Sequence, residues 1–377
     1  MSQINCQLRL GEVPLHLYQV ITGFKMLEKQ GVVKLDIEII KNHEERTPYN
    51  ILEVIINNDI KIYYDVNDGY DNLLKENQNY QGFMNSLLEK CDFYFKRSFS
   101  SLYNKRLKQQ EKIFPLGLNY MVTTQGNKAH MPLPHDPSKE KMKKLIRLFP
   151  LSEFYNGNYN VNYFEDSPRL SETPKILFMA RLWDVKGDFP GQISKEKMEE
   201  RRYINSVRAM CIRLCKQEFG DQFFGGVNAT PYALENYKDL VIADKNITNR
   251  KNYLKRLKDS HICIATMGLH ESIGWKFAEY IAASKAIVTE ELRYEVPGNF
   301  KEGRNYLTFF NPDHCIDQIN RIIGDKDYMY NMMVNNFEYY HQYVRPDRLI
   351  LNSILTVLNA ERLGKNEQNT NSVYSYV

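Results

Sequence analysis

Helical and strand-like patterns alternate along almost the whole chain. Apolar residues at helical spacing run through 15–31 and through 194–220, and each of these patterns ends at a glycine. Short apolar or alternating segments, which are typical of strands, occupy 33–40, 49–56, 59–66, 92–98, 112–118, 175–180, 222–227, 261–267 and 286–289. Such alternation is the signature of layered α/β domains, in which helices cover a sheet.

The chain contains two such series, divided by a polar stretch rich in Asn, Ser and Pro. Its 377 residues exceed the usual size of one domain. We therefore predict an N-terminal domain over 1–165, a linker over 166–174, a C-terminal domain over 175–345 and a last helical segment with a frayed tail over 346–377. Ligands of open α/β sheets bind at the carboxyl ends of strands, where loops lead into helices. Two β/α domains joined in this way create a cleft.

Composition places few limits on the function. Hydrophobic residues make up 43% and charged residues 25% of the chain, and the net charge is +4. This balance suits a folded protein with an acidic small ligand and does not require nucleic acid as a partner. The patterns of a signal peptide and of a membrane span are lacking, which predicts a soluble, cytoplasmic protein. Cys211 and Cys215 are expected to be buried thiols rather than metal ligands.

Two features of the middle of the chain remain open. The segment 137–149 is basic on one side and apolar on the other, so it is either a surface helix packed on its domain or a peripheral contact with the inner face of a membrane. His130 and His135 are either acceptor-side residues or solvated loop histidines.

Two carboxylates flank a glycine in the loop that follows 261–267. A helix that begins near Trp275 would offer free N–H groups and a positive dipole end, which suit a phosphate. Gly274 would allow close approach of a ligand, and Glu271 and Glu279 could accept hydrogen bonds from vicinal hydroxyls. The structural alternative makes Glu271 a charge favoured by the helix dipole and Glu279 a solvated surface residue.

Arg181 and Lys186 follow directly from the strand segment 175–180. A diphosphate leaving group gains negative charge as its bond to a sugar breaks, and two cations directed at it would stabilise the transition state. The structural alternative is a surface ion pair with Asp184 or Asp188.

The segments FMARLWDVKG (178–187) and HESIGWKFAEYIAASKAIV (270–288) together resemble the C-terminal domain of a GT-B glycosyltransferase, of the retaining family-4-like kind (glycosyl transferases group 1). In that family a Lys follows an Arg by five residues, and seven residues separate two glutamates; both spacings occur here. The resemblance covers roughly 175–310. It implies an α/β fold of two Rossmann-like domains facing a cleft, with the last helix packed back on the first domain.

The resemblance also implies roles for individual residues. Arg181 and Lys186 would contact the donor diphosphate, Glu271 would face the transferred sugar, and Glu279 would hold the nucleotide ribose. Backbone contacts to the donor would come from Ser272, Ile273 and Gly274. Gly11 is a candidate for the loop that meets the donor across the cleft.

The sequence departs from the family pattern at several positions. Ser272 and Ala180 stand where glycine is usual, and Trp275 and Lys276 are additions after the loop. These departures leave the donor sugar open, and Lys276 is a further candidate phosphate contact.

We therefore predict a glycosyltransferase that moves a sugar from a UDP- or GDP-sugar to a cell-surface polysaccharide, glycolipid or related acceptor. Retention of configuration and independence of metal follow from the resemblance. The alternative is a non-catalytic relative that binds sugar nucleotides or serves as a surface-layer component. An NAD-dependent oxidoreductase is disfavoured because no G-x-G-x-x-G follows a strand.

Overall fold

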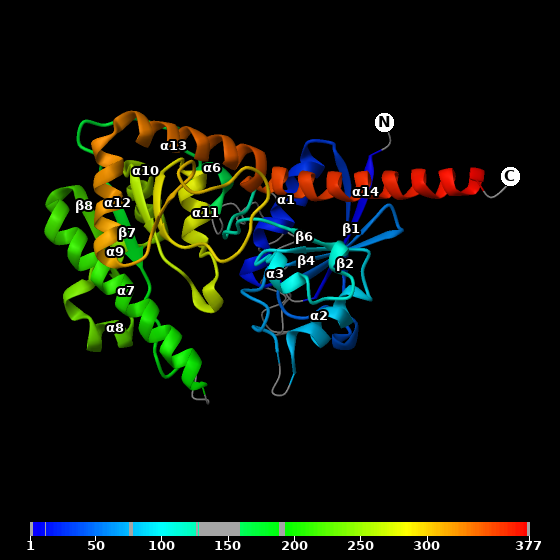
Figure 1. Cartoon of the computed structure of the whole chain (residues 1–377), viewed down its shortest axis with the longest axis horizontal. Coiled ribbons are helices and arrows are strands. Elements are labelled where there is room, and N and C mark those ends of the chain that lie inside the picture. Colours follow the sequence, from blue (N-terminus) through cyan, green and yellow to red (C-terminus); the bar gives the residue numbers. More distant parts are fainter. Residues whose placement is uncertain are drawn as a thin grey trace, which may run out of the picture.

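In the part of the chain that the structure describes, two six-stranded sheets form the centres of two α/β domains. The computed structural model describes residues 3–11, 13–74, 78–125, 127, 159–187 and 193–374. Figure 1 shows the two domains side by side, so the prediction of two Rossmann-like domains is confirmed. The expectations for His130, His135 and the basic segment 137–149 lie outside the described residues.

The N-terminal sheet has the strand order β2-β1-β3-β4-β5-β6. Its strands are β1 (Ile4–Leu10), β2 (Val33–Ile39), β3 (Ile51–Ile56), β4 (Ile60–Asp65), β5 (Phe93–Lys96) and β6 (Ile113–Pro115). All neighbours pair in parallel except β3, which is antiparallel to β1 and β4. The β3–β4 hairpin turns at Asn57 and Asn58, whose positive φ angles of 52° and 62° fit a type I′ turn.

Strand β1 is not among the strands that the sequence patterns predict. Its polar residues alternate with Cys6, Leu8 and Leu10, which are buried in the N-terminal core. The alternation of buried and more exposed residues therefore identifies this strand, whereas its mean hydropathy does not.

The last helix belongs to the N-terminal core. Helix α14 (Pro346–Tyr374) packs along α1 (Tyr18–Lys29), and Ile350 and Ile354 are fully buried with Phe24. Figure 1 shows α14 running along this domain and beyond it. The other helices that the structure describes in this half are η1 (Leu15–Leu17), η2 (His43–Glu45), α2 (Tyr80–Leu88), α3 (Ser101–Asn104), η3 (Gln110–Lys112) and α6 (Val161–Phe164).

The C-terminal sheet is parallel throughout and has the order β12-β11-β10-β7-β8-β9. Its strands are β7 (Ile176–Ala180), β8 (Phe223–Asn228), β9 (Val241–Ile242), β10 (Ile262–Ala265), β11 (Ala286–Glu290) and β12 (Leu307–Phe309). The direction in which the chain crosses the sheet reverses between β7 and β10. The loops that leave these two strands therefore diverge, and such a switch point leaves a crevice for a ligand.

Helix α7 (Lys195–Phe219) is the longest helix of the C-terminal domain. It begins where the Ser194 side chain accepts a hydrogen bond from the Lys197 N–H, and it ends at Gly220, whose φ is +47°. The serine cap is a standard helix start, and a positive φ is a conformation that glycine adopts without steric cost. The other helices of this half are η5 (Gly220–Gln222), α8 (Pro231–Asn236), η6 (Lys238–Leu240), α9 (Lys245–Thr248), α10 (Arg250–Asp259), η7 (Leu269–Glu271), α11 (Trp275–Ala282), α12 (Pro312–Gly324), α13 (Lys326–Tyr339) and the π-helix η8 (Tyr340–Val344).

The six cysteines are free and buried, as expected for Cys211 and Cys215. Among the described residues, no group of three or more His, Cys, Asp or Glu side chains is arranged to hold a metal ion. In the same part of the chain, no helix combines the length and apolar character that crossing a bilayer needs.

One ion-pair cluster joins the two places where the chain crosses between domains. Arg345, between η8 and α14, donates to Glu165 at 2.9 Å and to Asp347 at 2.8 Å. Gln30 of α1 also donates to Asp347 at 2.9 Å. These contacts tie the two crossings to the N-terminal domain on one side of the cleft.

Candidate functional site

A cavity of about 420 Å³ lies between the domains, at the carboxyl ends of β7 and β10. This size is typical of a small-molecule site. The polar and aromatic side chains that line it are His16, Asp68, Arg97, Phe178, Arg181, Trp183, Arg208, Thr266, Ser272, Trp275, Lys276, Phe277 and Tyr280. The crevice predicted from strand order is therefore a cavity that both domains line.

Helix α7 holds the loop that follows β7. Asn205 accepts a hydrogen bond from the Trp183 N–H at 2.8 Å and donates to the Trp183 carbonyl at 2.7 Å. One turn earlier, Arg201 donates to the carbonyl of Asp184 at 2.5 Å. Both backbone groups of Trp183 are thus paired with one side chain of α7, which fixes the path of the loop.

Arg208, also on α7, joins the two loops of the switch point. Its guanidinium donates to the Arg181 carbonyl at 2.5 Å, to the Met267 carbonyl at 2.8 Å and to Thr266 Oγ1 at 2.9 Å. Burial lowers its pKa to about 10, so the side chain remains charged near neutrality. This arginine braces the crevice and adds positive charge to its wall.

The β10–α11 loop, residues 268–274, brings backbone groups to the cavity. His270 and Glu271 both have left-handed backbone conformations, with φ of 57° and 56°. Gly274 is the residue before α11, and a Cβ placed there would meet nothing within 4 Å. A ligand can therefore approach the N-terminal end of α11, which favours an anion.

The N-terminal domain contacts this loop directly. Arg97 donates to Asp68 at 2.8 Å and to the carbonyl of Ile273. Trp275 Nε1 donates to Asn119 at 3.0 Å, so both ends of the 273–275 segment are held from across the cleft.

Two further contacts complete this interface. The His270 ring lies 2.8 Å from an Asp71 oxygen, and the His16 ring packs 4.6 Å from the Trp275 ring. Burial and the nearby Arg97 lower the pKa of His16 to about 4, so it is neutral near pH 7. The structure therefore shows the domains closed upon one another.

The charge of the cavity wall is strongly asymmetric. Among the residues that the structure describes, its charged side chains are Arg97, Arg181, Arg208 and Lys276 against one carboxylate, Asp68. Burial lowers the pKa of Lys276 to about 8, and its ammonium lies 4.0 Å from the Tyr253 ring centre. A wall of this composition favours a multiply charged anion.

Glu279 lies behind the cavity and does not line it. The residue is 3% exposed and accepts hydrogen bonds from Arg250 at 2.9 Å and from Tyr253 at 2.6 Å. The surface alternative considered for it is wrong, because the carboxylate is buried and paired. Its assignment to the ribose stays a prediction.

The remaining predicted site residues divide into those inside and those outside the cavity. Arg181, Ser272, Gly274 and Lys276 line it together. Glu271 and Ile273 line a small hollow beside it, and Glu271 lies 3.8 Å from Arg293. Lys186 is exposed on the turn after β7, and Gly11 lines a separate hollow of the N-terminal domain.

Sequence patterns do not single out Asp68, Arg97 or Arg208. An arginine within a long polar helix such as α7 reads as an exposed residue, whereas Arg208 is 8% exposed. Asp68 and Arg97 follow β4 and β5, and that position at the carboxyl end of a strand is the signal that could have indicated them.

No protein-family model matches this chain, and no curated protein matches it in sequence. Solved structures with a similar fold include the C-terminal domain of the group 1 family glycosyltransferase LpcC from Francisella tularensis, at 13% identity over 49% of this chain and 97% of that chain with a TM-score of 0.32. HepE from Anabaena in complex with UDP matches at 12% identity over 89% of each chain with a TM-score of 0.41.

A protein from Listeria monocytogenes, named for a proposed UDP-N-acetylglucosamine 2-epimerase activity, matches at 9% identity over 96% of this chain and 98% of that chain with a TM-score of 0.38. These identities and TM-scores are low, so the likenesses do not assign an activity. The chain is similar to GT-B glycosyltransferases in its two Rossmann-like domains, and its activity has to be judged from the residues of the cleft.

Proposed function

We propose that this protein is a glycosyltransferase that binds a nucleotide-sugar in the interdomain cavity and transfers the sugar to an acceptor. The observation that carries the proposal is the cavity itself. It lies at the switch point of a Rossmann-type sheet, and within the described part of the chain four cations and the N-terminal end of α11 line it against one carboxylate. A diphosphate flanked by two hydroxyl-rich groups has the charge and shape that suit this wall.

Leaving-group stabilisation is the chemistry that these residues can supply. Negative charge develops on the diphosphate as the bond to the sugar breaks, and preorganised cations lower the energy of that state. Arg181, Arg208 and Lys276 line the cavity from the C-terminal domain, on both sides of the crevice. Lys186 and Glu271 enter the proposal through the family resemblance, which assigns them to the diphosphate and to the transferred sugar.

The finer parts of the proposal also follow that resemblance. We expect a UDP- or GDP-sugar donor, retention of configuration and catalysis without a metal ion. The acceptor would be a cell-envelope polysaccharide, glycolipid or related glycan, and the reaction would take place in the cytoplasm or at the inner face of the membrane.

The second candidate is a non-catalytic relative that binds sugar nucleotides. The displacement of Glu271 from the main cavity favours it, because the carboxylate that would face the sugar pairs at 3.8 Å with Arg293 instead. Donor hydrolysis or transfer by the purified protein separates the two candidates, since a binding protein would show affinity without turnover.

The first experiment is thermal unfolding in the presence of UDP, GDP, ADP, CMP and their common sugar conjugates. A ligand at ~100 times its dissociation constant adds ~2.7 kcal/mol to the folded state, which a melting scan resolves. Stabilisation by one nucleotide, followed by turnover of its sugar conjugate, would support the transferase. Arg181→Ala should then lower kcat by ~10²-fold without loss of the fold. Absence of stabilisation by every nucleotide would refute a nucleotide-sugar site.

A further inference from the structure

Arg97 reaches from the N-terminal domain to the loop before α11. It is the first residue after β5 and is 5% exposed. One nitrogen of its guanidinium donates to Asp68 Oδ1 at 2.8 Å, and the other donates to the main-chain oxygen of Ile273, which lies 176 residues later. A single side chain therefore connects the two domains at the edge of the cavity.

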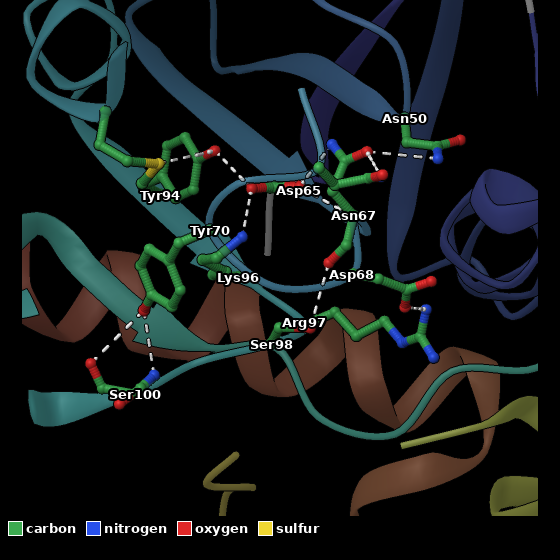
Figure 2. Close-up of polar contacts among 12 residues, drawn as sticks. Asn50, Asp65, Asn67, Asp68, Tyr70, Tyr94, Lys96, Arg97, Ser98 and Ser100 are labelled. Atoms are coloured by element: carbon green, nitrogen blue, oxygen red, sulfur yellow. Dashed lines mark hydrogen bonds and ion pairs between the residues drawn. The ribbon is translucent and has the colours of Figure 1, made fainter. Parts of the chain in front are cut away.

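The main chain at Arg97 is held in place because the preceding residue, Lys96, forms a buried ion pair with Asp65. Figure 2 shows Asp65, the last residue of β4, beside Lys96, the last residue of β5. Their charged atoms lie 2.8 Å apart, and both side chains are almost fully buried. Asp65 also accepts hydrogen bonds from the Tyr94 hydroxyl at 2.7 Å and from the Asn67 N–H at 2.8 Å.

Backbone contacts extend this anchor into the two loops that leave the strands. The Arg97 N–H donates to the Asp65 carbonyl at 2.9 Å, and the Ser98 hydroxyl donates to the Asn67 carbonyl at 3.1 Å. Figure 2 shows the Arg97 side chain leaving this cluster towards Asp68. The main chain is thus held at Arg97 itself and at Asn67, the residue before Asp68.

The loop that Arg97 contacts requires support from outside. His270 and Glu271 are consecutive non-glycine residues in the left-handed region, which costs conformational free energy that surrounding contacts must offset. The N-terminal domain supplies such contacts through the pairing of Asp71 with His270 and of Asn119 with Trp275. The N-terminal domain therefore contacts this loop from across the cleft at His270 and at Trp275.

We propose that Arg97 is a positioning residue, which holds the β10–α11 loop and the start of α11 in the geometry for donor binding while the domains are closed. The proposal rests on the sugar transfer proposed above. In this role the guanidinium donates hydrogen bonds to two acceptors at once, Asp68 and the Ile273 carbonyl. A lysine has a point-like ammonium and a different reach, so it cannot replace this planar fork.

The chain provides its own reporter for this contact. It has two tryptophans, Trp183 and Trp275, and both line the cavity. In a Trp183→Phe background, Trp275 is the remaining tryptophan, and it contacts His16 and Asn119 of the opposite domain. Its emission maximum and its quenching by acrylamide therefore report separation of the loop from the N-terminal domain.

The test compares Arg97→Ala and Arg97→Lys in this single-tryptophan background, without ligand. We expect both changes to shift the Trp275 emission to longer wavelength and to increase its quenching. In the wild-type background, the loss of one charge-assisted hydrogen bond to the loop should raise both the dissociation constant for the stabilising nucleotide and the KM for its sugar conjugate by about tenfold. Arg106→Ala, at an exposed arginine of the same domain, should change none of these quantities.

Two results would overturn the proposal. Unchanged Trp275 emission and quenching in Arg97→Ala would show that the contact does not hold the loop, and wild-type behaviour of Arg97→Lys would show that one positive charge suffices. Asp68→Asn is a second variant, which keeps the Arg97 guanidinium but removes the charge of its partner. It should shift the Trp275 emission in the same direction by a smaller amount. If the unsubstituted protein binds no nucleotide, the proposed function fails, while the ligand-free fluorescence still decides the role of Arg97.

Discussion

The Glu279 carboxylate and the Arg250 guanidinium form a buried pair at 2.9 Å, between helices α11 and α10. The Tyr253 hydroxyl donates a hydrogen bond to the second carboxylate oxygen of Glu279 at 2.6 Å. The carboxylate expected to hold a ribose is thus already paired with two side chains of the same domain. Nucleotide binding at Glu279 would have to exchange one of these hydrogen bonds for a hydroxyl of the ligand.

Glu279→Ala should weaken nucleotide binding and also destabilise the fold, because it leaves the mostly buried Arg250 without its carboxylate. Loss of one partner of such a pair costs about 3 kcal/mol, which chemical denaturation would measure. The double variant Arg250→Met, Glu279→Met removes both charges and both hydrogen-bonding groups, and it should recover most of that stability. If nucleotide affinity recovers with it, Glu279 is structural; if affinity stays low, the ribose assignment stands.

Nucleotide affinity should fall as the pH rises through about 8, because burial lowers the pKa of Lys276 to about 8. The ammonium that attracts a diphosphate is present below this pH and is lost above it, whereas the phosphates, whose second pKa is about 6, are already mostly ionised at pH 7. Loss of the charged contact should weaken binding by about 10- to 100-fold. Calorimetric titration from pH 7 to pH 9.5 tests this, and Lys276→Met should bind weakly with no pH dependence over that range. An unchanged pH profile in Lys276→Met would assign the dependence to another group.

Arg208→Met should destabilise the protein by about 3 kcal/mol or more and abolish nucleotide binding. The change leaves buried carbonyl oxygens of both switch-point loops without donors, and each such loss costs about 1–3 kcal/mol. Arg213→Met is the matched control on the same helix, since Arg213 forms an exposed pair with Asp239 at 2.9 Å. Exposed pairs contribute about 0–1 kcal/mol. Equal unfolding midpoints for the two variants would contradict the bracing role of Arg208.

Gly23→Ala should disrupt the packing of α14 on α1. A Cβ at this position would lie 2.2 Å from the Pro346 carbonyl oxygen, so the helices would have to separate. We expect a loss of about 2–3 kcal/mol in the free energy of unfolding. Gly82→Ala in α2 is the control, because its Cβ would come no closer than 3.3 Å to the end of the Asn79 side chain. Similar stabilities of the two variants would refute this account of the α1–α14 contact.

Local sequence patterns predicted where the site lies, but they did not predict how its charged residues are paired. The loops after β7 and β10 were expected to carry the chemistry, and the structure brings Arg181, Ser272 and Gly274 into one cavity there. The paired state of Glu279 was not predictable, because Arg250 lies on another helix and the sequence does not show which faces of two helices meet. The same reason hides Arg97, whose acceptor at Ile273 is in the other domain.

The sequence by itself determined the alternation of helices and strands, the positions of the two switch-point loops and the glycine before α11. These features depend on periodicity and backbone conformation within a few residues, which neighbours in the chain settle. Only the tertiary structure decided that Glu279 is withdrawn behind the cavity, that Arg208 joins two loops and that Arg97 crosses the cleft. The free energy of a charged group depends on its burial and on partners tens or hundreds of residues away, and packing alone brings those partners together.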